Sequence, residues 1–420
     1  MDKLIINKNG PLSGEIKVSG AKNSVLKILA ATLLTDEECV IEDVPDLLDV
    51  RVMIDLLRSL GSDVKYYPEE NRVVTKVVDS SITDASYELT NKMRASIVVM
   101  GPLLAKRKRA NVSYPGGCAI GARPIDLHLK GFRALGVDVH LGHGFVEAKV
   151  DEKVKGNTVY LDFPSVGATE NIMLAATLAD GVTVIENAAQ EPEISDLAMF
   201  LIKMGAKISG AGTSNIRITG VEKLGGATHQ VIPDRIEAGT YIIGVAMTKG
   251  KAKINNVVPK HLSPLISKLE EAGVKFESVD NGILVDATNG FSGVDITTLP
   301  YPGFPTDLQS QFMVFLCLCK GSNTIKETIF ENRFMFVSEL TRMGAKIKTD
   351  SSTAEVYEIP ELEGAIVRAT DLRAGAALVL AGLVASGETQ VLDVYHIDRG
   401  FVNIEEKLGK LGAKIKRIKE

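Results

Sequence analysis

The 420-residue sequence lacks the features of several protein classes. It has only four cysteines, Cys39, Cys118, Cys317 and Cys319, and they do not have the spacing of a zinc site. Three of them lie in apolar stretches, so we expect reduced thiols. The first eight residues lack the apolar core of a signal peptide, and the longest apolar runs are too short to span a membrane. These absences predict a cytoplasmic globular protein.

An excess of basic residues is also missing. The net charge is −5 at pH 7, whereas proteins that bind nucleic acid through phosphate contacts usually carry a basic excess. The sequence has no P-loop and no Rossmann glycine fingerprint, and its six histidines form no recognisable metal set. Any anion site must therefore be local.

One short phrase recurs six times along the chain. It consists of an apolar residue, a glycine, a residue that is usually small, Lys or Asp, and a strand-forming residue. The glycines are Gly61, Gly136, Gly205, Gly273, Gly344 and Gly412, at spacings of 68 to 75 residues. This regular period indicates six repeats of about seventy residues.

Each phrase ends an amphipathic helix and begins a hairpin. Upstream lies a second helix that is small or apolar on nearly every face, which indicates burial. These helices are expected at residues 21–34, 92–105, 169–179, 236–248, 308–319 and 372–385.

The unit is therefore strand, buried helix, strand, amphipathic helix and hairpin. Because one unit cannot cover its own buried helix, we expect an α/β fold of two domains, each with three repeats, helices inside and sheets outside. Residues 4–19 are expected to form one strand that packs with the second half, and the boundary is expected within residues 220–233.

The segment Pro115–Leu127 contains three glycines within six residues, together with Cys118 and Arg123. Glycine frees the backbone and allows close approach to a ligand, which is typical of a lid that carries a reactive group. The alternative is a glycine-rich turn in which Cys118 is a small buried apolar residue. The rest of the chain favours the lid.

Polar residues gather at the start of each buried helix. Helix N-termini offer free N–H groups and the positive end of the dipole, which suit phosphate or carboxylate. The residues are Lys22 and Asn23, Met93 and Arg94, residues 167–171, Asp234 and Arg235, Thr306 and Asp307, and residues 371–373.

A second polar position recurs in the loop before each amphipathic helix. Arginine at such a position can grip a planar carboxylate or phosphate with two parallel hydrogen bonds. Any one of these residues alone could equally be a surface ion pair or a helix cap. Cations that recur at matched repeat positions in an acidic chain instead predict a site for a strongly anionic ligand. They are Lys22, Arg94, Arg123, Arg333, Arg373 and Arg399.

Motifs along the whole chain resemble the UDP-N-acetylglucosamine 1-carboxyvinyltransferase family. They are Ser19–Asn23, Pro115–Leu127, Ser165–Thr169, Pro233–Glu237, Phe304–Asp307, Phe330–Met335, Asp371–Ala374 and Tyr395–Gly400. The resemblance implies transfer of the enolpyruvyl group of phosphoenolpyruvate to the 3'-hydroxyl of UDP-N-acetylglucosamine, without a metal or organic cofactor. It also implies two inside-out α/β barrels of βαβαββ repeats, residues 20–231 and residues 1–19 with 232–420, and an active site between them.

The resemblance also implies roles for single residues. Lys22, Arg123 and Arg399 resemble the ligands of the phosphoenolpyruvate phosphate, and Arg333 and Arg373 complete the basic pocket. Cys118 resembles the lid acid, and Asp307 the base near the 3'-hydroxyl. The positions that hold the UDP-sugar are Asn23, Arg94, Arg123, Pro124, Ile125, Asp126, Leu127, Ser165, Val166, Gly167, Asp307 and Ile329.

One segment departs from the pattern. Some members of the family carry a lysine in the uridine-binding loop where this chain has Asp162–Ser165, so we expect Phe163 to replace an ionic contact with packing.

Three alternatives stay open at this point. The sister transferase that acts on shikimate 3-phosphate has the same fold and donor, but its family lacks the cysteine-bearing lid. A sliding clamp is also a six-fold α/β repeat, but it turns basic helices toward DNA, whereas half of the helices here are apolar all round. A non-catalytic UDP-sugar sensor would leave the cysteine and the aspartate without a purpose.

Overall fold

The computed structural model describes residues 2–114, 125–142 and 144–419. Within them the chain divides into two compact units. The N-terminal unit contains residues 20–114 and 125–232, and the C-terminal unit contains residues 2–19 and 233–419. Each unit carries three four-stranded sheets.

The three sheets of the N-terminal unit share one topology. A short edge strand runs parallel to its neighbour, and the remaining pairs are antiparallel. In spatial order they are β14 (Thr228–Gln230), β3 (Cys39–Glu42), β5 (Arg72–Val77) and β4 (Ser62–Tyr67); β6 (Asp84–Ala85), β7 (Arg109–Ser113), β9 (Phe145–Lys149) and β8 (Asp138–Leu141); and β10 (Thr158–Tyr160), β11 (Val182–Glu186), β13 (Asn215–Thr219) and β12 (Lys207–Ser209).

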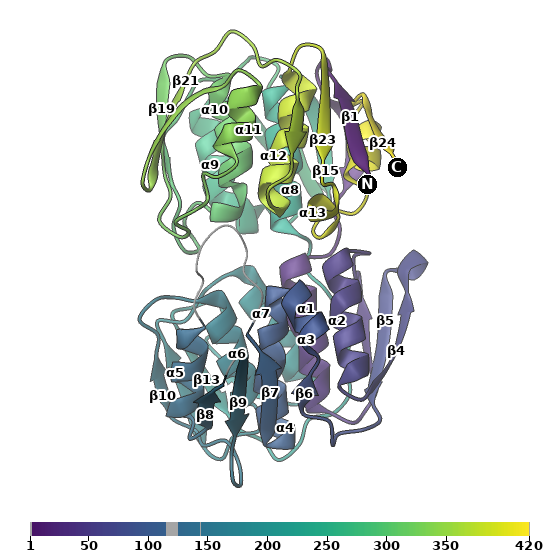
Figure 1. Ribbon diagram of the computed structural model, residues 1–420, viewed down its shortest axis with the longest axis vertical. Coiled ribbons are helices and arrows are strands. Elements are labelled where there is room, and N and C mark those ends of the chain that lie inside the picture. The colour runs from purple at the N-terminus through teal and green to yellow at the C-terminus, as the bar shows by residue number, and fades with distance from the viewer. Residues whose placement is uncertain (1, 115–124, 143, 420) are drawn as a thin grey trace. The chain divides into compact units, whose positions relative to one another are not determined.

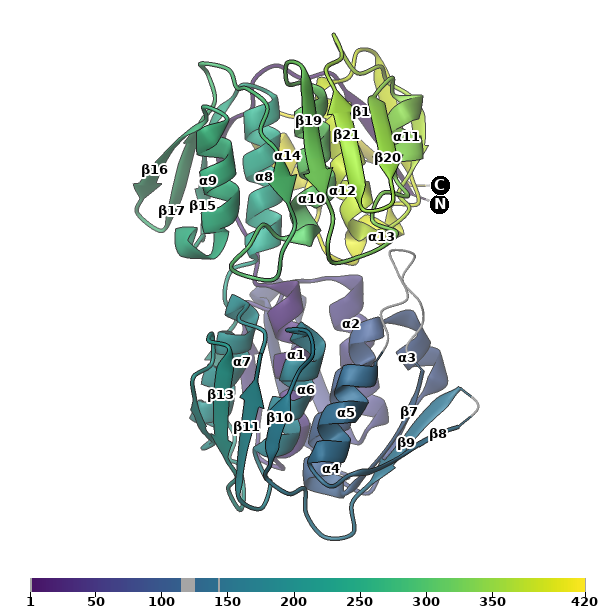
Figure 2. The same ribbon diagram turned by 90° about the vertical axis from the view of Figure 1, so that its left-hand side faces the viewer.

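The helices of this unit fall into the two predicted kinds. The central helices are α1 (Lys22–Ala31), α4 (Met100–Arg107) and α6 (Val166–Ala176), and every residue of α6 from Ala168 onward is buried. The amphipathic helices are α2 (Leu48–Ser59), α5 (Asp126–Ala134) and α7 (Pro192–Lys203). Figures 1 and 2 show the helices inside this unit and the sheets outside.

One predicted buried helix is wrong in its extent. Instead of a helix over residues 92–105, α3 (Tyr87–Lys92) ends before an extended Met93, and the 3-10 segment η3 (Arg94–Val99) leads into α4. Pro102 has no N–H to donate to the fourth residue before it. It is tolerated in the first turn of α4, so the α-helix begins at Met100.

The C-terminal unit repeats the same architecture. Its sheets are β2 (Ser13–Lys17), β15 (Lys251–Asn255), β17 (Gly282–Asp286) and β16 (Lys275–Val279); β18 (Ile296–Thr297), β19 (Ser322–Lys326), β21 (Thr353–Tyr357) and β20 (Lys346–Asp350); and β22 (Ile366–Arg368), β23 (Glu388–Leu392), β1 (Lys3–Asn7) and β24 (Ile415–Ile418). Besides its three core helices it has α9 (Ser263–Glu271), α11 (Val337–Arg342), α13 (Tyr395–Asp398) and α14 (Ile404–Lys410).

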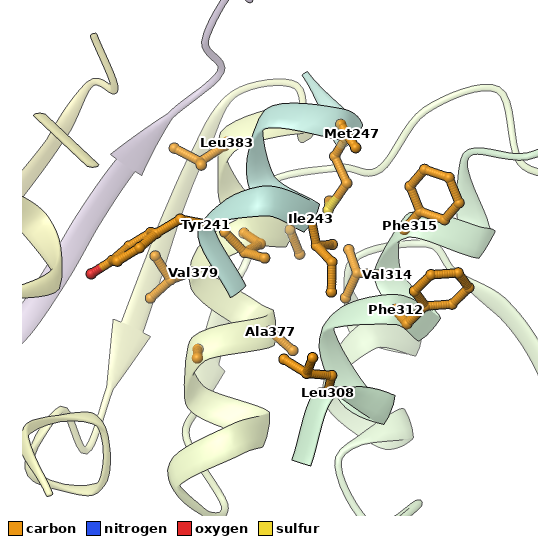
Figure 3. Close-up of a cluster of buried hydrophobic side chains, with 14 of the residues drawn as sticks. Tyr241, Ile243, Met247, Leu308, Phe312, Val314, Phe315, Ala377, Val379 and Leu383 are labelled. Atoms are coloured by element: carbon orange, nitrogen blue, oxygen red, sulfur yellow. The ribbon is translucent and has the colours of Figure 1, made fainter. Parts of the chain in front are cut away.

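Three helices form the core of this unit: α8 (Arg235–Met247), α10 (Gln309–Cys317) and α12 (Leu372–Val384). Figure 3 shows Ile243, Val314 and Ala377, one from each helix, turned toward the space that the helices share. All three are fully buried. The predicted α/β fold, with apolar helices inside and sheets outside, is confirmed.

The first residues of the chain belong to the C-terminal unit. β1 lies between β23 and β24, and β2 pairs with β15, so the expected packing with the second half of the chain is confirmed. The single strand expected over residues 4–19 is wrong, because Gly10 and Pro11 separate two strands.

The first and fourth repeats exchange their edge strands. β2 precedes α1 in sequence but runs parallel to β15, with Ile16 opposite Ile254. β14 precedes α8 but runs parallel to β3, with His229 opposite Ile41. In the other four repeats the edge strand pairs within its own repeat.

Every helix of the described ranges is too short or too polar to cross a membrane.

Candidate active site

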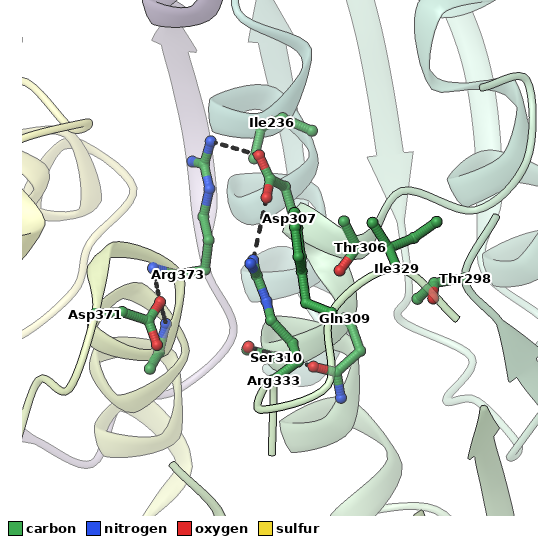
Figure 4. Close-up of polar contacts among 12 residues, drawn as sticks. Ile236, Thr298, Thr306, Asp307, Gln309, Ser310, Ile329, Arg333, Asp371 and Arg373 are labelled. Carbon is green, nitrogen blue, oxygen red and sulfur yellow. Dashed lines mark hydrogen bonds and ion pairs between the residues drawn. The ribbon is translucent and has the colours of Figure 1, made fainter. Parts of the chain in front are cut away.

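Asp307 lies between two buried arginines at the start of a central helix. It belongs to the 3-10 turn η5 (Thr306–Leu308), which leads into α10. Nη2 of Arg333 lies 3.1 Å from Oδ1 of Asp307, and Nη2 of Arg373 lies 3.0 Å from Oδ2. Figure 4 shows the two guanidinium groups reaching the carboxylate from different sides. Three predicted site residues from two repeats therefore form one cluster.

The charges around Asp307 decide its protonation state. Partial burial raises the pKa of this carboxyl, but the guanidinium groups of Arg373, Arg333 and Arg235 outweigh burial and hold the pKa well below its usual range. Asp307 is thus a carboxylate in this structure, and it accepts a proton poorly while both arginines are in place.

Arg235 is a member of this group that was not among the predicted site residues. It lies in the first turn of α8, and its guanidinium lies 5.6 Å from the centroid of the Tyr301 ring. Its place at the start of a buried helix was the signal available in the sequence.

Side-chain caps fix where three central helices begin. Asp371 accepts hydrogen bonds from the N–H groups of Arg373 (2.8 Å) and Ala374 (3.1 Å), and thereby sets the first turn that carries Arg373 (Figure 4). Asp234 caps α8 in the same way, and Ser165 accepts from Ala168 N–H at 3.3 Å to cap α6.

Arg399 follows directly after α13. The residue before it, Asp398, is held by a second arginine, Arg417. Arg417 on β24 donates to both oxygens of Asp398 at 2.9 and 2.7 Å, and to Glu405 at 2.6 Å. Because Arg417 engages both oxygens of Asp398, it fixes the turn that carries Arg399.

In the N-terminal unit, Lys22 begins α1 and is buried. Its Nζ lies 2.7 Å from Oδ2 of Asp49, which is in the first turn of α2. Lys27 donates to the Asn23 carbonyl at 2.6 Å, and Ser24 donates to the buried Asp196. The first turn of α1, which presents Lys22 and Asn23, is therefore held from several sides.

The predicted UDP-sugar segments 125–127 and 165–167 meet at His128. A Cβ on Gly167 would lie 3.1 Å from the His128 ring, so a glycine lets α6 approach α5 closely. Asn171 Nδ2 lies 3.1 Å from Nδ1 of His128. Burial, and then the charge of Arg94, lower the pKa of His128 to about 3, so the ring is neutral.

The loop that departs from the family pattern precedes this cluster. Phe163 is 44% exposed. The neighbouring Asp162 forms an ion pair with Lys130, whose Nζ lies 2.6 Å from Oδ2. A cation is therefore present beside the loop, although it comes from α5.

The described site residues fall into two groups. Lys22, Asn23, Arg94, Ile125–Leu127 and Ser165–Gly167 belong to the N-terminal unit, and Asp307, Ile329, Arg333, Arg373 and Arg399 belong to the C-terminal unit. The predicted Cys118, Arg123 and Pro124 lie outside the described residues. The other three cysteines are buried, as predicted.

Known proteins resemble the chain over its whole length. The family model described as EPSP synthase (3-phosphoshikimate 1-carboxyvinyltransferase) matches residues 6–408. UDP-N-acetylglucosamine 1-carboxyvinyltransferase 1 of Caldanaerobacter subterraneus is 58% identical over 99% of both chains. UDP-N-acetylglucosamine 1-carboxyvinyltransferase 2 of Carboxydothermus hydrogenoformans is 56% identical over 100% of both. The chain belongs to the UDP-N-acetylglucosamine 1-carboxyvinyltransferase family.

Solved structures of more distant enolpyruvyl transferases share the fold. The enolpyruvyl transferase NikO from Streptomyces tendae aligns with a TM-score of 0.89 at 24% identity, over 99% of this chain and 98% of that one. EPSP synthase from Acinetobacter baumannii aligns with a TM-score of 0.77 at 16% identity over 100% of both chains. The higher identities to UDP-N-acetylglucosamine 1-carboxyvinyltransferases favour this family over the shikimate 3-phosphate enzyme and the clamp.

Proposed function

We propose that this protein transfers the enolpyruvyl group of phosphoenolpyruvate to the 3'-hydroxyl of UDP-N-acetylglucosamine and releases phosphate, the first committed step of peptidoglycan synthesis, in the cytoplasm. The observation that carries the proposal is the cluster of Asp307 with Arg333 and Arg373 in a chain that is 58% identical to such a transferase. It joins a carboxylate to the cations that an anionic donor needs.

The cations bind and orient the donor. Lys22, Arg123 and Arg399 hold its phosphate, and Arg333 and Arg373 complete the basic pocket. Holding two reactants in a productive geometry converts a bimolecular step into a unimolecular one. The acceptor is held by Asn23, Arg94, Arg123–Leu127, Ser165–Gly167, Asp307 and Ile329.

The reaction is an addition followed by an elimination. Cys118 donates a proton to the methylene carbon of phosphoenolpyruvate, and the adjacent carbon takes on oxocarbenium character. The 3'-oxygen attacks this carbon and its proton passes to Asp307. The Cys118 thiolate then takes a proton back from the new methyl group, the C–O bond to phosphate breaks, and the enol ether forms again. The leaving phosphate takes the proton that Asp307 received from the 3'-hydroxyl. Water would trap the cationic centre, so the lid has to exclude it.

The electrostatics of Asp307 add a condition to this mechanism. A carboxylate whose pKa is held far below its usual range by two arginines is a weak base. When the anionic groups of the donor pair with Arg333 and Arg373, these arginines stabilise the Asp307 carboxylate less. The pKa of Asp307 then rises, and it becomes a stronger base. Donor binding therefore prepares the base.

The decisive assay measures phosphate release from phosphoenolpyruvate with and without UDP-N-acetylglucosamine. Release that depends on the UDP-sugar supports the proposal. Release that depends on shikimate 3-phosphate instead would assign the sister activity, and UDP-sugar binding without any release would indicate a sensor.

A further inference from the structure

Glu327 is a buried carboxylate close to the candidate site that has no role in the proposed chemistry. It follows β19 directly and is 2% exposed. A buried charge is costly unless it is fully hydrogen-bonded. Its partners therefore indicate what the residue is for.

Four hydrogen-bond donors from three segments converge on this carboxylate. Oε1 accepts from the Thr298 hydroxyl at 2.9 Å, and from the N–H groups of Ile329 and Phe330 at 2.8 and 3.2 Å. Oε2 accepts from the Thr306 hydroxyl at 3.0 Å. Glu327 thus ties together the chain after β18, the turn η5 and the loop that follows β19.

Two of these segments lead directly to a site residue. Thr306 is the residue before Asp307, and Ile329 is itself a predicted contact of the UDP-sugar. Phe330 carries the connection further, because the Arg333 guanidinium lies 5.7 Å from the centroid of its ring. Figure 4 shows Thr298, Thr306 and Ile329 beside the Asp307 cluster.

A second set of bonds fixes the position of Thr298. Its hydroxyl accepts from Thr328 N–H at 2.9 Å, and its carbonyl accepts from the Thr328 hydroxyl at 2.6 Å. The chain after β18 and the loop after β19 are therefore joined at Thr328 as well as at Glu327. Such a network keeps its members at fixed separations.

We propose that Glu327 is a positioning residue for the acceptor substrate: it fixes Asp307 and Ile329 relative to each other through Thr306 and the loop 328–330. This inference rests on the proposed function. Misplacement of catalytic groups by about 1 Å is enough to cost a large factor in rate. Charge-assisted hydrogen bonds are the strong kind, so one carboxylate can hold three segments.

The main test removes one bond at a time. Thr306→Val keeps the shape of the side chain but deletes the donor to Oε2, and Thr341→Val, which removes an exposed hydroxyl on α11, is the matched control. Thr306→Val should raise KM for UDP-N-acetylglucosamine roughly tenfold, in line with losing one hydrogen bond to a charged group. KM for phosphoenolpyruvate should rise clearly less than KM for the UDP-sugar, because Thr306 is linked to the donor pocket indirectly, through the ion pairs of Asp307 with Arg333 and Arg373.

Variants of Glu327 itself complete the series. Glu327→Leu removes all four acceptor contacts and should weaken UDP-sugar binding, measured by calorimetry, more than Thr306→Val does. Glu327→Gln should recover most of the affinity, because its amide oxygen can still accept from Ile329 and Phe330 while the Thr306 hydroxyl turns to accept. A purely structural role would weaken both substrates alike instead of the UDP-sugar selectively. Glu277→Gln, an exposed change on β16, is the control.

The outcomes separate this inference from the proposed function. No UDP-sugar-dependent phosphate release by the unaltered protein would overturn the proposed function. If the unaltered protein is active, equal rises of both KM values in Thr306→Val, or no rise at all, would overturn the role of Glu327. If Glu327→Leu does not fold, Thr306→Val and Glu327→Gln decide the question.

Discussion

Lys22 Nζ lies 2.7 Å from the Asp49 carboxylate, and both side chains are buried, at 9% and 5% exposure. The pair joins the first turn of a central helix to the first turn of an amphipathic helix. In the proposed mechanism Lys22 holds a phosphate, so Asp49 sets the direction of that ammonium group before the donor arrives.

We expect Asp49→Asn to lower the free energy of unfolding by about 2–4 kcal/mol, because it leaves a buried ammonium group without its counter-charge. Asp36→Asn, which breaks the exposed pair with Lys106, should cost less than about 1 kcal/mol. Urea denaturation of both variants measures the difference. If Asp49→Asn and Asp36→Asn lower the free energy of unfolding by similar amounts, burial of the Lys22–Asp49 pair does not contribute to stability.

Asp307→Asn should leave both substrates bound but slow transfer by roughly two to four orders of magnitude, the usual range for losing a general base. Single-turnover rates and calorimetric affinities check this separately. Near-normal turnover with intact binding would remove Asp307 from the proton transfer.

Arg399→Lys should weaken phosphoenolpyruvate far more than UDP-N-acetylglucosamine, since lysine keeps the charge but loses the planar two-pronged contact. KM values for the two substrates provide the measurement. Equal effects on both would indicate general damage to the turn that Arg417 holds through Asp398.

Fosfomycin, a small phosphonate epoxide that resembles the donor, should alkylate Cys118 and leave the other cysteines unmodified. Burial raises the pKa of Cys39 to about 11 and those of Cys317 and Cys319 to about 12, so their thiolates are scarce near neutral pH. Peptide mass mapping locates the adduct. Cys118→Asp should escape alkylation yet keep activity, because a carboxylic acid can also deliver a proton. An adduct on another cysteine, or an active enzyme with Cys118 unmodified, is the contrary result.

Glu170 on α6 should make stability depend on pH. Burial raises its pKa from 4.5 to about 7, against the opposing charge of Lys27, whose Nζ lies 3.4 Å away. The folded state therefore holds a proton that the unfolded chain releases between these two values. Stability from this group is complete below pH 4.5 and is lost as the pH rises through 7.

Replacing this carboxyl by an amide tests the dependence. As the pH rises from acidic to neutral, the free energy of unfolding of Glu170→Gln should increase by on the order of 2–3 kcal/mol relative to that of the unaltered protein. Urea denaturation at several pH values measures the gain, with the exposed Glu152→Gln as control. Parallel curves for Glu170→Gln and the unaltered protein would contradict it.

The repeats and their helices could be predicted because their signals are local. A glycine such as Gly205 (φ +107°) or Gly273 (φ +102°) takes a left-handed backbone conformation after each amphipathic helix, which other residues rarely adopt. A helix that is apolar on all sides, such as α12, can only be buried.

Other features depend on contacts between distant segments and left no such signal. The strands β2 and β14 are short and have one buried residue each, so their own patterns do not show that they change places, although residues 4–19 were expected to pack with the second half. The sequence identifies Asp307 as a candidate base, but only the approach of Arg333 and Arg373 reveals how weakly it holds a proton. Glu327 was missed because it looks like an ordinary residue at the end of a strand.

The pairing of strands that are distant in sequence also fixes the order in which the two units can complete their sheets during synthesis on the ribosome. The N-terminal unit has all of its strands once β14 has emerged, near residue 230. β1 is made first, but its partners β23 and β24 are made last. A nascent chain therefore leaves its first strand without these partners while one whole unit folds behind it, and the C-terminal unit closes only after β23 and β24 have been made.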